Sequence, residues 1–376
     1  MKKFFYATIS SLCLIASAFS APKPPVLEPI EFDVIQEQGE INTYIIDPRV
    51  EVVAMICRLA ELPGFTNTYK NRADPVIPQM MTLLEKYKNH KAVKTVKSLQ
   101  KKGFDAGAMI SLSYHIKPDF SGTIIEFEPF PENLAPQWKK LGTKATYDFI
   151  KQIHSFAVDT NFKRLYVLNK TSYLQDVNYQ KKFAEDSGIA QWAEDFFKND
   201  EVESPVLTYS RFIVGYIFYD YIKGSDGKTT CCATLYPGCP PMDFEKCYIG
   251  FYAQLYAQKY WDDVKESFIN YYKDYQRKFH PERTEEFINK LEINYLYLTV
   301  LLADYCWLAY IKEIAPEDHP SYEELIGMME KEVGDKNIVE AIELIEEYTS
   351  NRNKYPTFDD FSTRINDFIK TLQIKE

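Results

Sequence analysis

The sequence has little of what the common catalytic sites are built from. Its 376 residues include five histidines and fourteen glycines, with no Gly-x-Ser-x-Gly nucleophile turn and no glycine-rich phosphate loop. No two histidines are four residues apart and none is followed by glutamate, so there is no His-Glu-x-x-His zinc helix. These absences argue against an α/β-hydrolase nucleophile, a P-loop nucleotide site and a zinc site with two histidines on one helix.

Long apolar runs are also missing, except near the amino terminus. Residues 4–18 carry almost no charge and follow the short basic segment Lys2-Lys3, and small residues come next. The run is too short and too interrupted by serine for a comfortable membrane span. The pattern predicts a cleavable secretory signal over residues 1–20, cut after Ser20 or alternatively after Ala18, with an uncleaved anchor as the competing interpretation. We therefore expect export to a periplasm, a cell surface or the medium.

Basic side chains are fewer than acidic ones, 44 against 54 in the whole chain. The whole chain has a formal net charge of −10, and loss of the signal leaves 42 basic and 54 acidic side chains, a net charge of −12. Nucleic acids and anionic lipids select basic surfaces, so neither is expected as the main partner. Hydrophobic residues make up 45% of the chain and aromatic residues 15%, which indicates a well-packed globular protein. Peptide or carbohydrate partners stay open.

Cysteine is scarce but clustered. Cys13 lies within the predicted signal, and an even number of cysteines remains in an exported chain, which predicts at least one disulfide. The expected bridge joins Cys231 or Cys232 to Cys239 or Cys247. Reduced packing cysteines and a zinc cluster are the alternatives, but the spacing lacks the paired Cys-x2-Cys of zinc knuckles. The six cysteines outside the signal are Cys57, Cys231, Cys232, Cys239, Cys247 and Cys306.

The apolar patterning predicts an α+β fold that is rich in helix, with β-hairpins in the first two-thirds and a helical C-terminal part. Residues 21–29 indicate a linker. Residues 30–372 then form one α+β domain, or two lobes that divide near residue 240, one mixed (30–240) and one helical (241–372). Strands are expected at 30–35, 41–46, 206–222 and 229–235, a further hairpin over 108–129, and the main helices at 48–60, 76–88, 91–101, 144–158, 178–197, 243–278, 284–314, 321–332, 336–349 and 358–372.

One helix start is sharply marked. Asp47 suits the N-cap position, and Pro48 suits the first helical position, where its missing N–H is no loss. Val50, Val53 and Cys57 then fall on one face of the expected helix.

Several blocks in the chain, taken in order, resemble a known family. In their order and spacing over residues 31–372, they are similar to a secreted bacterial family described as domain of unknown function number 4932. Members of that family usually carry a His-Glu-x-x-His helix like that of zinc metallopeptidases, so the resemblance implies a zincin-like scaffold. The blocks are Asp47-Pro48-Arg49-Val50-Glu51, Ile56-Cys57-Arg58-Leu59-Ala60, Asn89-His90-Lys91-Ala92-Val93, Phe104-Asp105-Ala106, Asp159-Thr160-Asn161-Phe162 and Tyr355-Pro356-Thr357-Phe358-Asp359-Asp360-Phe361.

The zinc helix that the family carries is degenerate in this chain. Two histidines one helical turn apart share a Zn²⁺ ion, and the glutamate beside the first acts on the bound water. The resemblance places this motif on residues 249–253, where Ile249 and Ala253 fill the histidine slots and Gly250 fills the glutamate slot. None of these side chains can bind zinc or accept a proton. Glu292 is the nearest carboxylate for the third ligand, on the later helix.

A tyrosine recurs every four residues along the same helix. The functional interpretation is a groove whose rings stack on sugars or hold a peptide. The competing interpretation is close helix packing, with the small residues beside the stripe admitting a neighbour. His90 and His154 are interpreted as capping or packing residues. The tyrosines of the stripe are Tyr248, Tyr252, Tyr256 and Tyr260.

These observations favour an exported, non-catalytic relative of the putative zinc metallopeptidases, with a binding or structural role. No catalytic residue, metal or cofactor is expected. A hydrolase with an unidentified site is one alternative, and a surface protein that binds carbohydrate or peptide through aromatic faces is the other.

Overall fold

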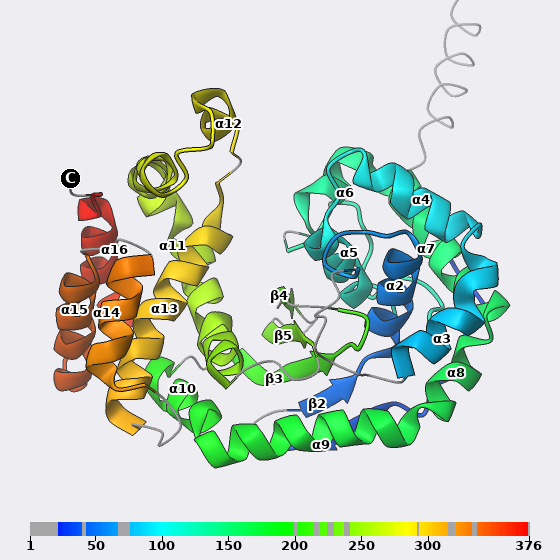
Figure 1. Ribbon diagram of the computed structural model, residues 1–376, viewed down its shortest axis with the longest axis horizontal. Helices are drawn as coiled ribbons and strands as arrows, with labels where there is room; N and C mark the ends of the chain where they lie inside the picture. The colour runs from blue at the N-terminus through cyan, green and yellow to red at the C-terminus, as the bar shows by residue number, and fades with distance from the viewer. Residues whose placement is uncertain are drawn as a thin grey trace, which may run out of the picture. The chain divides into compact units, whose positions relative to one another are not determined.

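The computed structural model describes residues 22–39, 43–66, 76–131, 133–198, 202–213, 218–223, 229–236, 241–291, 293–314, 320–332 and 337–374. The fold is α+β and rich in helix, as predicted (Figure 1). The predicted signal, its cleavage site and Glu292 lie outside the described residues. Within those ranges, no helix combines the length and apolar character needed to cross a membrane.

The chain folds into two units, and each is discontinuous in sequence. Unit 1 holds the described residues of Met1–Val34, Ile46–Thr171 and Ser210–Gly215, and unit 2 holds those of Ile35–Ile45, Ser172–Tyr209 and Tyr216–Glu376. This division differs from the boundary near residue 240 that the sequence suggested. The reason is that strands distant in sequence pair in one sheet, which groups with the C-terminal helices.

Unit 1 is built around the helix α2 (Pro48–Leu59), which is buried over most of its length. Asp47 caps this helix by accepting the backbone N–H of Arg49, and Pro48 occupies its first turn, so the predicted helix start is confirmed. α2 packs against three helices of the same unit, α4, α5 and α7 (Figure 1). The helices of unit 1 are α2, α3 (Val76–Leu84), η1 (Glu85–Tyr87), α4 (Lys91–Gln100), α5 (Ala106–Tyr114), α6 (Pro136–Leu141), α7 (Thr143–Asp159) and α8 (Phe162–Leu168).

The hairpin predicted over residues 108–129 is wrong. Residues 106–114 form the helix α5, which Asp105 caps by accepting the N–H of Ala108. Only an isolated bridge between Ile116 and Thr123 follows it. The helix is buried on nearly every side, so its sequence is apolar with no helical period, and such a run cannot be distinguished from a buried strand by pattern alone.

The segment expected as a linker is docked on unit 1. The backbone N–H of Leu27 donates to the carbonyl of Ser121 at 2.9 Å, and that of Ile30 donates to Asp119 at 2.7 Å. Gly122 lies so close to this segment that an added Cβ would be 2.5 Å from the carbonyl oxygen of Pro25. Residues 22–33 are therefore part of the folded unit.

Unit 2 contains a five-stranded mixed sheet with the order β1-β2-β3-β5-β4. β2 and β3 are parallel, β3 and β5 are parallel, and β4 and β5 are antiparallel. The predicted hairpin before α11 is confirmed as β4 and β5, although β3 and β4 are separate strands rather than one over 206–222. The strands are β1 (Ile35–Gln38), β2 (Thr43–Ile46), β3 (Val202–Tyr209), β4 (Phe218–Lys223) and β5 (Thr229–Leu235).

The longest helix, α11, runs for 39 residues from Pro241 to Phe279 and is the central helix of unit 2. It packs against α10, α13 and α16 and against strands β4 and β5 (Figure 1). The other elements of this part of the chain are α9 (Lys170–Ser187), α10 (Ile189–Phe197), α12 (Glu285–Asn289), α13 (Tyr295–Ile314), α14 (Tyr322–Glu332), α15 (Ile338–Ser350), η2 (Asp359–Phe361) and α16 (Ser362–Thr371).

Candidate functional site

The three positions that the sequence resemblance assigned to a zinc helix lie on the buried face of α11. Ile249 and Ala253 are fully buried, and Gly250 is buried between them. Side chains at such positions are normally packed against their neighbours, because protein interiors are close-packed. These three positions therefore belong to the core of unit 2.

The tyrosine stripe on α11 also points into unit 2. The Tyr248 hydroxyl lies 3.2 Å from that of Tyr44 on β2, and Tyr252 stacks on Phe197 of α10 with ring centroids 4.9 Å apart. Such pairs are typical of packed aromatic cores. The stripe is thus buried at these positions, and the interpretation of Tyr248 and Tyr252 as groove-lining residues needs correction.

The same holds for the next turn of the stripe. Tyr256 is 3% exposed and donates from its hydroxyl to the carbonyl of Ser362 and to the side-chain oxygen of Asn366, both 3.1 Å away. Tyr260 is half-buried, and its ring lies 4.7 Å from that of Tyr256. Burial raises the pKa of both Tyr248 and Tyr256 above the ordinary value. Both hydroxyls therefore stay protonated, and their hydrogen bonds join α11 to β2 and to α16.

The expected disulfide also needs correction. Cys232 on β5 and Cys247 on α11 are buried as reduced cysteines, as are Cys57 and Cys306. Among the described residues, no bridge uses Cys232 or Cys247. The remaining pairing, Cys231 with Cys239, stays a prediction because the Cys231 side chain and Cys239 lie outside the described part of the chain. Counting thiols in denaturant, without reductant, tests it, and six thiols in the mature chain would exclude the bridge.

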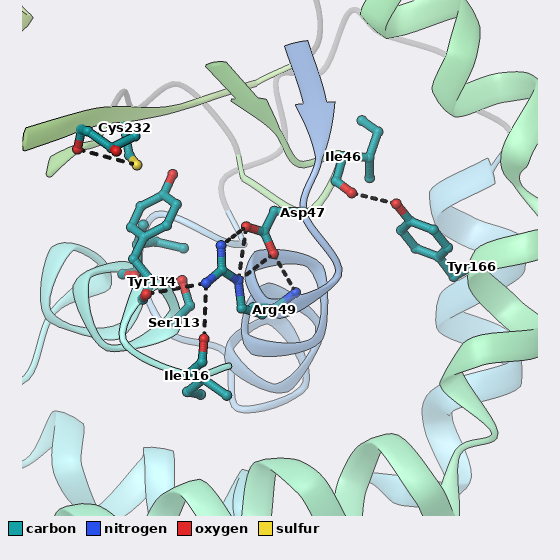
Figure 2. Close-up of polar contacts among 10 residues, drawn as sticks. Ile46, Asp47, Arg49, Ser113, Tyr114, Ile116, Tyr166 and Cys232 are labelled. Atoms are coloured by element: carbon teal, nitrogen blue, oxygen red, sulfur yellow. Dashed lines mark hydrogen bonds and ion pairs between the residues drawn. The ribbon is translucent and has the colours of Figure 1, made fainter. Parts of the chain in front are cut away.

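The best-organised charged cluster in unit 1 is centred on Asp47 and Arg49 (Figure 2). The guanidinium of Arg49 donates two hydrogen bonds to the Asp47 carboxylate, from Nε to Oδ1 at 2.9 Å and from Nη2 to Oδ2 at 2.5 Å. Nη1 of Arg49 donates to the carbonyl of Ile116 at 3.0 Å and to that of Tyr114 at 3.3 Å. The Asp47 side chain is 3% exposed and that of Arg49 is 12% exposed.

This cluster joins the start of α2 to the end of α5. A carboxylate that accepts hydrogen bonds from two nitrogens of one guanidinium, and from the backbone N–H at a helix start, has little capacity to accept a substrate proton. Nearby, the Tyr166 hydroxyl donates to the carbonyl of Ile46 at 2.5 Å (Figure 2), and the fully buried Glu51 accepts the N–H of Arg211 at 3.2 Å. The arrangement positions the backbone rather than reactive groups.

The histidines of unit 1 also serve local structure. His90 caps α4 through Nδ1, which accepts the N–H of Ala92, and its Nε2 lies 3.1 Å from the carboxylate of Asp159. Nε2 of His154 lies 2.8 Å from the carbonyl of Glu28. The predicted capping role of His90 is therefore confirmed, whereas His154, predicted to lie on a packed face, is half-buried and contacts a backbone carbonyl instead.

Sequence reasoning missed a buried carboxylate in unit 2. Glu245, in the first turns of α11, is 1% exposed, and its Oε2 accepts the indole N–H of Trp307 on α13 at 2.9 Å. The sequence offered one signal, because the residues one helical turn away from Glu245 are apolar or aromatic, such as Met242, Tyr248 and Ile249. Buried charges of this kind need partners, and the indole supplies one.

The described ranges contain no group of three or more His, Cys, Asp or Glu side chains arranged to hold a metal ion.

Comparisons of the chain with protein-family models, with curated proteins and with solved structures find no match.

Proposed function

We propose that this protein is an exported, non-catalytic relative of the putative zinc metallopeptidases, with a binding or structural role. One observation carries the proposal. The three positions that correspond to the zinc helix by sequence resemblance, Ile249, Gly250 and Ala253, are apolar and buried in the core of unit 2.

The chemistry of those positions supports the same view. A catalytic zinc normally takes three protein ligands and one water. Isoleucine and alanine offer no lone pair, and glycine offers no base. The small side chains instead allow the neighbouring elements of unit 2 to approach α11 closely.

Metal analysis together with a cleavage assay tests the proposal. The mature protein, purified without chelator, should contain no stoichiometric zinc and should cleave no member of a peptide library in a zinc-dependent manner. One zinc per chain, or cleavage that chelator abolishes and zinc restores, would place it among active metallopeptidases instead. Cleavage that is indifferent to chelator would favour the alternative of a hydrolase with another site.

Export is tested separately by sequencing the amino terminus of protein recovered outside the cytoplasm. The expected first residue is Ala21, or Phe19 if cleavage follows Ala18. Soluble exported protein that retains Met1 would contradict the predicted signal.

A further inference from the structure

The helices α13, α14 and α15 pack together in unit 2 (Figure 1). A cavity of about 380 Å³ opens between them. Its apolar part is formed by Tyr305 and Ala309 of α13 and by Ile342 and Ile345 of α15. Tyr305 and Ile345 are almost fully buried, so they form a fixed floor rather than a mobile surface. The cavity is large enough for an aliphatic chain with a polar head.

The polar rim of this cavity is acidic. Glu313 and Glu346 both line it, together with one cationic side chain, Lys312. The Lys312 ammonium pairs with the Glu346 carboxylate, so the residues that line the cavity comprise two carboxylates and one ammonium. An anionic ligand entering here would meet two carboxylates.

Glu313 is held by a neutral donor. Its Oε2 accepts the indole N–H of Trp192 at 2.7 Å, and within the described ranges no basic side chain forms an ion pair with it. The nearby guanidinium of Arg352 is engaged by backbone carbonyls, at 2.7 Å from Phe196 and 2.8 Å from Asp195. The indole orients the Glu313 carboxylate, and Arg352, which lies outside the cavity lining, attracts it electrostatically without forming a direct ion pair.

The surroundings of the Lys312 ammonium show how the rim holds a cation. Its ammonium lies beside the Glu346 carboxylate and 5.4 Å from the ring centroid of Tyr322, so one cation meets both a carboxylate and an aromatic face. Carboxylates and aromatic faces together are a general means of holding organic cations. The pairing with Glu346 also raises the pKa of Lys312.

We propose that this cavity binds an alkyl ammonium group from outside the chain, either a free aliphatic amine or the lysine side chain of a peptide. The ammonium contacts Glu313 and Glu346 at the rim, and the aliphatic stem lies against Ala309, Ile342 and Ile345. Lys312 competes with the ligand for Glu346. The proposal is independent of whether the protein binds zinc, because it uses no residue of the degenerate motif.

Methyl NMR of protein labelled at isoleucine tests the proposal directly. Butylammonium and Nα-acetyl-lysine amide should shift the Ile342 and Ile345 methyl signals in a saturable way, with dissociation constants of about a millimolar for so few contacts. Butanol and butyrate are the matched neutral and anionic probes, and they should not. Saturable binding of butanol or butyrate at the same signals, or none by either amine, would overturn the proposal. Tighter binding of a lysine peptide than of butylammonium would identify a peptide as the source.

Two pairs of variants locate the ammonium. Glu346→Gln should weaken butylammonium binding about two- to fivefold, whereas Glu343→Gln, on the same helix but outside the cavity lining, should leave it unchanged. Lys312→Gln should strengthen binding, because it removes the internal competitor. Lys182→Gln removes the same charge from the exposed face of α9 and serves as its control.

The outcomes are distinguishable. Equal effects of Lys312→Gln and Lys182→Gln would show that only overall charge matters, and this would overturn the site. Equal effects of Glu346→Gln and Glu343→Gln would do the same. Loss of the methyl pattern in a variant spectrum reports misfolding, and Lys312→Met, which keeps the aliphatic stem, then decides whether removing the ammonium strengthens binding.

Discussion

The indole N–H of Trp307 donates a 2.9 Å hydrogen bond to the carboxylate of Glu245, and both side chains are almost completely buried. Lys246, the next residue of α11, pairs with Asp304 at 2.7 Å and lies 4.6 Å from the Trp307 ring centroid. The first turns of α11 are thus joined to α13 by polar contacts within an otherwise apolar seam. Buried polar contacts of this kind are strongly coupled, so the loss of one partner removes a hydrogen bond from the other inside the core.

Replacing the indole tests this coupling. Trp307→Phe keeps a ring in the core but removes the N–H, and we expect a loss of about 2 kcal/mol of unfolding free energy. Glu245→Gln keeps an acceptor oxygen and removes the buried charge, so its cost should be smaller. Denaturant unfolding of both variants and of the double variant measures the coupling energy. Trp261→Phe, at a half-buried position on the same helix, is the control, and an equal loss there would contradict the role assigned to the hydrogen bond.

The ion pair between Asp47 and Arg49 should stabilise unit 1. Arg49→Lys keeps the charge but cannot grip the carboxylate with two nitrogens while reaching the carbonyls of Tyr114 and Ile116. Leaving a buried carboxylate with a poorer partner should cost about 1–3 kcal/mol in chemical unfolding. Arg277→Lys changes an exposed arginine on α11 and should cost less than about 0.5 kcal/mol. Equal losses of unfolding free energy at the two positions would show that the Asp47–Arg49 ion pair stabilises the fold no more than an exposed one.

Docking of residues 22–33 should depend on the absence of a side chain at Gly122. Gly122→Ala places a Cβ 2.5 Å from the Pro25 carbonyl oxygen, so the extended segment has to shift. We expect faster hydrogen exchange at the N–H groups of Leu27 and Ile30 and earlier proteolysis within this segment. Gly327→Ala on α14, where a Cβ meets nothing within 4 Å, is the control and should be neutral or stabilising by about 0.5–1 kcal/mol. Unchanged exchange in Gly122→Ala would show that the segment tolerates the side chain.

Stability should fall as the pH drops through the range of a buried histidine. His115 is 1% exposed, and burial lowers its pKa below the ordinary value of 6.5. The unfolded chain then binds a proton that the folded chain does not. The contribution is fully present above about pH 6.5 and is lost as the pH falls from there towards the folded pKa, by at most about 1.4 kcal/mol per pH unit.

Unfolding free energies measured from pH 8 down to pH 5 check this sign. His115→Gln should flatten the slope, because glutamine does not titrate. His280→Gln, at a more exposed histidine, should leave the slope close to that of the unaltered protein. A His115→Gln protein with an undiminished slope would assign the pH dependence to other groups.

The local sequence predicted helix boundaries correctly where one or two residues restrict the backbone conformation. Asp47 and Pro48 predicted the start of α2 correctly, and the helical period after Pro241 predicted α11 within about two residues at either end. Pattern failed at residues 106–114, because a helix buried on nearly every side has no polar face to reveal its period. It also left the partners of the strands open, since the pairing of β2 with β3 joins residues more than 150 positions apart.

The sequence by itself determined that the chain is acidic, rich in aromatic residues and α+β, and that it contains no His-Glu-x-x-His motif. Only the tertiary structure decided which aromatic faces are covered. The hydroxyls of Tyr44 and Tyr248 meet across 204 positions of sequence, and Tyr256 meets Asn366 across 110. A helical stripe specifies only which residues share a face. Whether that face forms a ligand groove or a packed seam depends on which distant elements lie against it, and that is a property of the folded chain.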